Sequence, residues 1–199
     1  MNLKKYYFKY PIVLISLCIT LNNCKQKTTY SKAIPIDLPY KFKTEKAESL
    51  SVKAFNLRKE KKYDEAISLY QQAIAIEPDN PKLFFDVSEC YANKQEFKEA
   101  LSALDTALKL DSLNPDFYNN RGLIYWKLYK DENAINDYKK AIELGSKRQA
   151  VFCNLALAYY TSKKQTQACE AFKIAKKLGL KASDIADDEY LRALDESCK

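Results

Sequence analysis

The chain has 199 residues, of which 47% are hydrophobic and 30% charged, with a formal net charge of +7. Only three glycines and six prolines occur, a scarcity that disfavours turn-rich β folds and favours helices. The sequence contains no histidine, which excludes Ser-His-Asp triads, Cys-His dyads and His-ligated zinc sites.

The first 23 residues have the pattern of a secretory signal peptide. A basic segment with three lysines and no acid precedes the apolar run 11–21, which is short for a membrane-spanning helix. The run ends in a Leu-Asn-Asn-Cys motif that resembles a bacterial lipobox, with Asn23 where that motif has Gly, Ala or Ser. The resemblance implies cleavage before Cys24 and lipidation of its thiol. An ordinary signal peptide and an uncleaved anchor are the alternatives, and all three export the chain.

Removal of residues 1–23 leaves 30 basic and 26 acidic side chains, so the net charge of the remainder is only +4. Four lysines fall in the last turns of predicted helices, where a positive charge complements the helix dipole: Lys139, Lys140, Lys176 and Lys177. We therefore predict no nucleic-acid partner.

Residues 24–46 are predicted to be the lipidated cysteine followed by a flexible tether. They contain Pro35 and Pro39 and show no helical period. A flexible coil of this length spans on the order of 25 Å, which would lift a domain clear of the lipid headgroups.

From residue 47 the chain repeats every 34 residues, giving units 47–80, 81–114, 115–148 and 149–182. A small residue recurs in the first half of each unit, with larger apolar residues four before it and three after it, which is the spacing of one helical face. The small residues are Ala54, Ser88, Gly122 and Ala156. The flanking large residues are Leu50, Phe84, Tyr118 and Phe152 before, and Leu57, Tyr91, Tyr125 and Tyr159 after.

A second helix is predicted in each unit, facing the first. Its columns are the alanines Ala66, Ala100, Ala134 and Ala168, then Tyr70, Leu104, Tyr138 and Phe172, then Ala73, Ala107, Ala141 and Ala175. Small residues let two helix axes cross closely, and large residues beside the crossing fill the gaps. The pairs Asn80-Pro81 and Asn114-Pro115 offer an N-cap followed by proline at the first helical position.

These columns at this period resemble the tetratricopeptide repeat, over residues 47 to about 180. The resemblance implies an all-α solenoid of four helical hairpins. Residues 183–199 are predicted to close the stack as one capping helix, with Ser183 as its N-cap and with Ile185, Leu191 and Leu194 packed on unit four.

In this family the first helices line a concave groove that holds peptides or partner helices. The resemblance therefore implies a partner-binding set in this chain, of which Phe85, Asn120, Trp126 and Asn154 are the strongest candidates. Alternatively, Trp126 packs inside a hairpin junction and the asparagines only solvate a helix face. The full set is Phe55, Arg58, Phe85, Asn119, Asn120, Leu123, Trp126, Lys127, Asn154, Leu157 and Tyr160.

One subfamily grips the C-terminal carboxylate of chaperone tails with lysine, arginine and asparagine. This chain does not match that pattern in either alignment of its units. Asp86 and Asp116 fall at such positions in one alignment, and Phe85 and Glu89 in the other, where only Asn120 agrees. We expect no carboxylate clamp.

Beyond Cys18 and Cys24, the cysteines are Cys90, Cys153, Cys169 and Cys198, and no two of the six form a C-x-x-C pair. Without histidine, a zinc site would need all four thiolates to converge, so we predict no metal site. Buried free thiols are the default expectation, and a disulfide between Cys169 and Cys198 is the most plausible alternative in an oxidising compartment.

The sequence thus predicts a non-enzymatic scaffold without catalytic residues or cofactor. We expect a monomeric domain, held by lipid on Cys24 at the periplasmic face or outer membrane of a bacterial envelope, that binds a partner polypeptide in its groove. The alternative is a module that binds a glycan or another non-protein envelope ligand.

Overall fold

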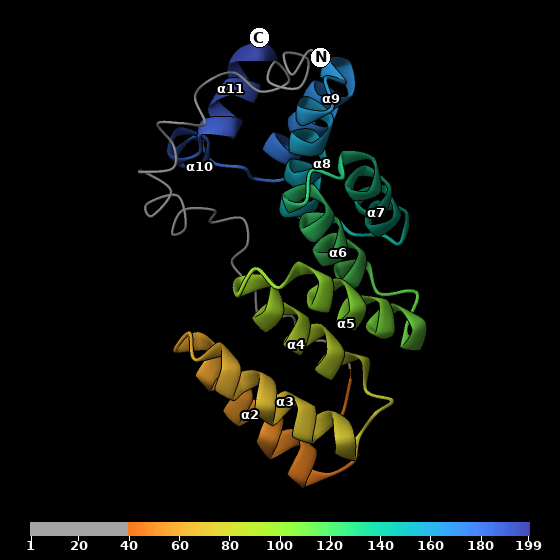
Figure 1. Cartoon of the computed structure of the whole chain (residues 1–199). Helices are drawn as coiled ribbons and strands as arrows, with labels where there is room; N and C mark the ends of the chain where they lie inside the picture. The colour runs from red at the N-terminus through yellow and green to blue at the C-terminus, as the bar shows by residue number, and fades with distance from the viewer. Residues whose placement is uncertain (1–39) are drawn as a thin grey trace, which may run out of the picture.

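The structure is a computed structural model that describes residues 40–199 (Figure 1). Every regular element of these residues is an α-helix, and the first eight pair into four hairpins. The hairpins are α2 (Glu45–Lys59) with α3 (Tyr63–Ile76), α4 (Pro81–Asn93) with α5 (Phe97–Leu110), α6 (Pro115–Lys127) with α7 (Asp131–Glu143), and α8 (Gln149–Thr161) with α9 (Gln165–Lys177). Two short helices follow, α10 (Ala182–Asp187) and α11 (Glu189–Ser197).

The hairpins stack one on the next along the chain, as Figure 1 shows. The predicted tetratricopeptide-repeat solenoid of four hairpins with a C-terminal cap is confirmed. Within residues 40–199, no helix is long and apolar enough to cross a membrane. The predicted signal peptide, residues 1–23, and the lipidation site Cys24 lie outside the described residues.

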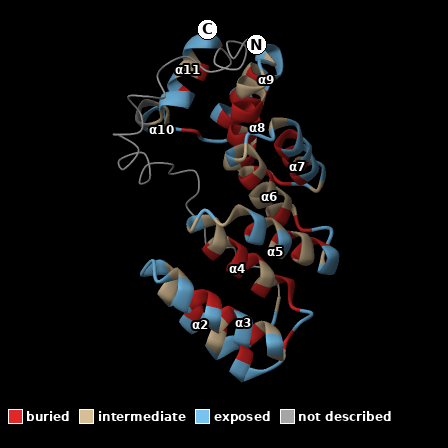
Figure 2. Ribbon diagram, in the orientation of Figure 1, coloured by how far each residue is buried: buried red, intermediate tan, exposed pale blue. Residues whose placement is uncertain are grey.

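The core of the stack is built from the predicted columns. The small residues Ala54, Ser88, Gly122 and Ala156 are all buried, and red segments follow the hairpin interfaces in Figure 2. The tightest crossing is in unit three, where a Cβ added to Gly122 would lie 2.8 Å from Cε1 of Tyr138. The aromatic ring of the second helix therefore occupies the space that a larger residue at the crossing would need.

Side-chain caps start the first helices of the first three units. The Asn80 Oδ1 accepts from the backbone N–H of Lys82 at 3.2 Å, and the Asn114 Oδ1 accepts from Asp116 at 2.9 Å. Proline follows each asparagine at the first helical position. Thr44 caps α2 in the same way, so these helix starts follow from local chemistry.

The turn inside each hairpin contains one residue in the left-handed region. These residues are 34 positions apart: Lys61, Gln95, Tyr129 and Lys163, with φ between 58° and 64°. Each lies between the helices, where backbone N–H groups bond back to the carbonyls of the first helix. Glycine would fill such a position without strain, but none of the four units has one here.

The C-terminal segment differs from its prediction. In place of one helix capped by Ser183, the chain forms α10 and α11 with a break at Asp188. The break arises because the Asp188 carboxylate accepts from the backbone N–H of Leu191 at 3.0 Å and so starts a new helix. The buried Leu191 and Leu194 pack on unit four as predicted, so α11 is the helix that closes the stack.

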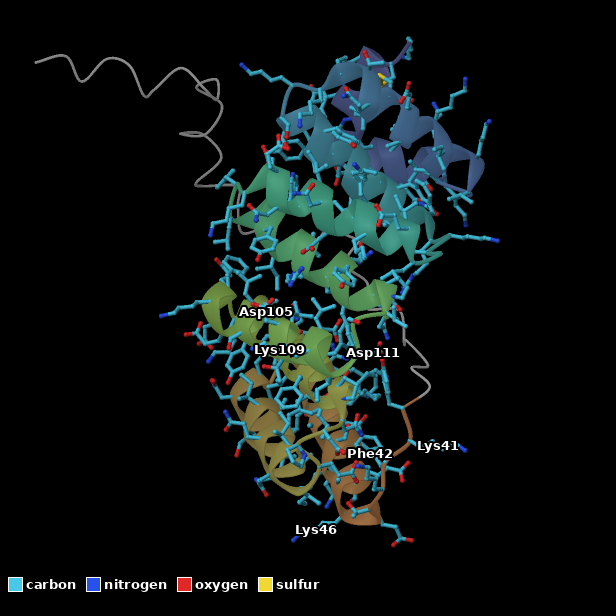
Figure 3. The ribbon with its side chains drawn as sticks, turned by 90° about the vertical axis from the view of Figure 1, so that its right-hand side faces the viewer. Lys41, Phe42, Lys46, Asp105, Lys109 and Asp111 are labelled. Carbon is cyan, nitrogen blue, oxygen red and sulfur yellow. A yellow bond between two sulfur atoms is a disulfide. The ribbon has the colours of Figure 1, made fainter. Side chains whose placement is uncertain are left out.

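Of the predicted tether 24–46, residues 24–39 lie outside the described residues, and the C-terminal end differs from the prediction. Residues 40–44, which we call the strap, pack along the loops between hairpins, and α2 already begins at Glu45. Figure 3 shows Phe42 turned toward the helices and Lys41 away from them. The segment is ordered because its aromatic side chains and backbone groups find partners in units one to three, which a search for helical periods cannot detect.

Candidate partner-binding face

The candidate site is the exposed side of the first helices α2, α4, α6 and α8, which we call the first-helix face. The predicted partner-binding residues all come from these four helices at matching positions of the 34-residue repeat. The stack fixes the phase of each helix, because one side is buried in the hairpin. The surroundings of each residue decide whether its side chain is available to a ligand.

In unit one, Phe55 lies under two cations. The guanidinium carbon of Arg58 is 5.1 Å and the ammonium of Lys59 4.7 Å from the centre of its ring. Arg58 is also ion-paired with Glu89 of unit two. Burial raises the pKa of Glu89 to about 7, although Arg58 opposes this shift. Arg58 is thus engaged within the protein, whereas Lys59 remains exposed.

Two predicted contact residues are buried and are corrected here. Phe85 is 3% exposed and packs on Phe117 of unit three, with ring centres 5.3 Å apart. Leu157 is 7% exposed and belongs to the core of units three and four. Phe85 is covered by unit three, and Leu157 is buried in the core that units three and four share with α11.

Two of the three asparagines predicted on α6 and α8 are hydrogen-bonded to each other. The Asn154 side-chain amide donates to Oδ1 of Asn119 at 3.2 Å, and Asn154 is 7% exposed. This pair ties the first helices of units three and four together and leaves Asn154 little surface for a ligand. Asn120 and Leu123, one turn apart on α6, are only partly buried and stay available.

Trp126 has partners on two other helices. Its indole N–H donates to Oγ1 of Thr161 on α8 at 3.3 Å, and its ring meets Tyr190 of α11 edge-on at 6.1 Å. Beside it, Lys127 is exposed, and desolvation lowers the pKa of its ammonium. Tyr160 is partly buried against the same core.

Charges on this face are largely paired within the protein, which the predictions missed. Besides the Arg58–Glu89 pair, Lys82 pairs with Asp86 and Arg148 with Asp116, all from first helices or the residue before one. The i, i+4 spacing of Lys82 and Asp86 was readable in the sequence. The pairs between units were not, because they depend on how the hairpins tilt.

Tyr190 is a further residue of this face that sequence reasoning missed. It comes from α11 and reaches the first helix of unit three. No column signals it, since the cap is not a repeat. The capping helix therefore contributes an aromatic side chain to the candidate site.

A separate open cleft of about 420 Å³ lies between the second helices α3 and α5, over α4. Its walls include Ile74, Phe84, Tyr91 and Ala103. It faces away from the predicted partner-binding residues, none of which lines it.

Comparisons with known proteins agree with this fold. Two models described as tetratricopeptide repeat match residues 57–120 and 115–146. None of the curated proteins compared with the chain matches it.

Several solved structures have a similar fold. MamA from Desulfovibrio magneticus RS-1 is 15% identical with a TM-score of 0.67, covering 78% of this chain and 88% of that one. YrrB, described as having an unusual peptide-binding site, is 16% identical with a TM-score of 0.61, covering 76% and 84%. The first repeat domain of Spaghetti (RPAP3), bound to an HSP90 peptide, is 29% identical with a TM-score of 0.56, covering 61% and 94%.

Proposed function

Because the chain is a tetratricopeptide-repeat solenoid, we propose that it is a non-enzymatic scaffold that binds a partner polypeptide along its first-helix face. The observation that carries the proposal is a set of available side chains on three of the four first helices, α2, α6 and α8, in which Phe55 matches Leu123 and Lys59 matches Lys127 in repeat position. These are Phe55, Lys59, Asn120, Leu123, Lys127 and Tyr160. Two proteins of similar fold are described as binding a peptide or having a peptide-binding site, which supports this reading.

The charges of the face indicate what kind of segment it takes. Arg58, Arg148 and Lys82 are already paired with acids of the face, so a partner carboxylate would have to compete with a partly buried ion pair. Asn120 can pair with a peptide backbone through both donor and acceptor. We infer an extended segment with apolar side chains, on which an acidic group could pair with the exposed Lys59 or Lys127.

The alternative of a glycan ligand is disfavoured by the engagement of Trp126. A sugar-binding site needs an open aromatic face with free polar groups around it. Here the indole N–H is bonded to Thr161 and the ring meets Tyr190.

The proposal further places the scaffold in a bacterial envelope. Its support is the lipobox-like Leu21–Cys24 motif after a short apolar run. Two or three acyl chains on Cys24 would anchor the protein stably. In the Cys24→Ser variant, labelled fatty acid should no longer be incorporated; equal labelling of this variant and the wild type would contradict the anchor.

Capture of partners by the tagged full chain from solubilised membranes tests the binding face. Leu123→Arg places a bulky charge in the middle of the face and should abolish capture. Leu113→Arg is the matched control, because Leu113 is 72% exposed in the loop before α6 and outside the face. Equal capture by the two variants would contradict the proposed face, and binding only to a glycan array would favour the alternative.

A further inference from the structure

The capping helix α11 is held at its C-terminal end by side chains of α9. A disulfide joins Cys169 of α9 to Cys198, directly after α11; it is the yellow bond in Figure 3. Next to it, Nε2 of Gln165 donates to Oγ of Ser197 at 2.8 Å, and Nζ of Lys176 pairs with Asp195 at 2.8 Å. Of these three interactions, only the disulfide is covalent.

The other end of α11 reaches the candidate binding site. Tyr190, the second residue of the helix, meets Trp126 of α6 edge-on at 6.1 Å. The helix thus spans from the disulfide on α9 to an aromatic residue of the first-helix face. Any motion of α11 away from unit four separates the two rings.

We propose that the Cys169–Cys198 disulfide is a redox latch on the first-helix face. In the oxidised protein the disulfide keeps α11 docked with Tyr190 over Trp126. In the reduced protein α11 can detach, which uncovers Trp126 for an apolar side chain of a partner. The regulatory meaning of the latch rests on the proposed function of this face. The structural event, release of α11, does not.

The chemistry is a thiol–disulfide exchange with a dithiol reductant. One thiolate of the dithiol attacks a sulfur of the Cys169–Cys198 bond and forms a mixed disulfide, and its second thiolate then displaces the remaining protein sulfur. Two electrons and two protons pass to the two cysteines, which become thiols, and the dithiol becomes a disulfide. Cys169 and Cys198 are both partly exposed, so a reductant can reach them.

The other two cysteines of the described chain do not take part. Cys90 and Cys153 are buried free thiols, and burial raises the pKa of each thiol to about 12. They stay protonated and shielded at neutral pH. The latch is therefore specific to one pair.

Release on reduction follows from the size of the cap. α11 has nine residues, and a helix this short is unstable unless docked. The disulfide closes a loop of about 30 residues, and its loss is expected to favour the detached state on the order of a hundredfold. The buried Leu191 and Leu194 continue to favour docking, so the reduced cap opens and recloses while the repeats stay folded.

Trp126 is the only tryptophan of the chain, so its fluorescence reports the latch without any partner. The experiment measures acrylamide quenching of the full chain in detergent micelles before and after treatment with dithiothreitol, with thiols counted by maleimide labelling. Reduction should add two accessible thiols and raise the quenching constant severalfold.

Two variants make the test specific. Cys198→Ser should show the raised quenching without reductant and no further change with it. Tyr190→Ala keeps the disulfide but removes the covering ring, so it should be quenched more than the wild type in both states. Far-UV circular dichroism should show the repeats intact in each.

The latch proposal would be overturned if Cys198→Ser were quenched no more than the oxidised wild type, and if quenching of the wild type stayed the same after both of its thiols were released. If quenching rises but partner capture is indifferent to Leu123→Arg, the latch stands and the proposed binding face fails. The two proposals are therefore separable.

Discussion

The two ends of the repeat stack are closed by different means. At the N-terminal end the strap 40–44 is held by hydrogen bonds and aromatic contact, whereas at the C-terminal end α11 is held by a disulfide and two buried leucines. A terminal hairpin has only one neighbouring hairpin and lacks one of the two interfaces that bury an inner one. Both ends therefore recruit a segment outside the repeats.

The N-terminal closure centres on one buried carboxylate, Glu77, which follows α3. One of its oxygens accepts from the backbone N–H groups of Lys43 and Thr44, at 2.8 Å each, and from the Thr44 hydroxyl at 3.0 Å. The other accepts from the side chain of Asn80 at 3.2 Å. A single side chain thus links the strap, α2 and the start of α4.

The strap extends this link to unit three. The Tyr40 ring stacks on Phe117 at 6.2 Å, and its hydroxyl bonds to Asp111 and Asn114 (Figure 3 labels Asp111). Five residues therefore run past three repeats. The C-terminal cap, by contrast, contacts unit four, and its Tyr190 reaches unit three.

The largest expected effect lies between the two ends, in unit three. Tyr138→Ala should lower the free energy of unfolding by about 3–5 kcal/mol, because it empties a fully buried site beside Gly122. Thermal or urea unfolding followed by circular dichroism measures this. We expect the variants at the two ends, Leu194→Ala and Glu77→Gln, each to lower the free energy of unfolding by less than Tyr138→Ala does.

Tyr138→Phe is the matched control. The Tyr138 hydroxyl has no hydrogen-bond partner among residues 40–199, so its removal should be neutral or slightly stabilising. A large loss for the phenylalanine variant would show that the hydroxyl, not the ring, is what the site needs.

A smaller loss is expected at the C-terminal end. Leu194→Ala removes a fully buried side chain of α11 and should cost about 2–3 kcal/mol, the low part of the range for leucine, because a terminal helix can settle into the space. Hydrogen exchange should accelerate in α11 and not in α4. Leu178→Ala, at an exposed residue after α9, should change neither.

Glu77→Gln breaks the N-terminal closure and should cost about 1–3 kcal/mol, because one charged acceptor of several hydrogen bonds is lost. Asp79→Asn is its control two residues away. Asp79 only pairs with Lys43 at the surface, and such pairs contribute little. Urea unfolding should show a larger loss of stability for Glu77→Gln than for Asp79→Asn. Equal losses would show that Glu77 contributes no more to the N-terminal closure than a surface ion pair does.

The same carboxylate makes the N-terminal end sensitive to acid. Burial alone would raise the pKa of Glu77, but the hydrogen bonds from Asn80, Thr44 and Lys43 outweigh it and lower the pKa below its ordinary value of 4.5. A carboxyl with a lowered pKa contributes its full stability above the unfolded value and loses it as the pH falls through the folded value. The stability difference between the wild type and Glu77→Gln should therefore be constant from pH 7 to 5 and shrink below pH 4.5. A difference that grew on acidification would contradict this sign.

The repeats could be predicted from sequence because the same packing pattern recurs in each unit. A small residue at the crossing and an aromatic one beside it, as with Gly122 and Tyr138, recur at one period, and periodicity is readable without coordinates. Asparagine caps are equally local. These signals fixed the four hairpins and their columns.

The closures of the two ends and the burial of some residues of the first-helix face could not be predicted, because they depend on contacts that do not recur with the repeat. Tyr40 and Asn114 are 74 residues apart and belong to no period, so nothing local marks the strap. Phe85 and Leu157 lie on first helices as expected, but packing against neighbouring elements buries them. Sequence gives the phase of each helix, whereas the neighbour decides what stays exposed.

The smallest effect is expected in the turn inside each hairpin, a feature that should be the same at both ends of the stack. Gln95 in unit two and Lys163 in unit four both have φ near 60°, which costs a non-glycine residue about 1–2 kcal/mol. Glycine removes this cost but adds about 0.4–1 kcal/mol of unfolded-state entropy. Gln95→Gly and Lys163→Gly should therefore each stabilise by about 0.5 kcal/mol. Gln72→Gly, the same exchange inside α3, should instead destabilise by a similar amount. If the two turn variants differed in sign, the turns too would depend on their distance from the strap and the cap, and the contrast between ends and repeats would fail.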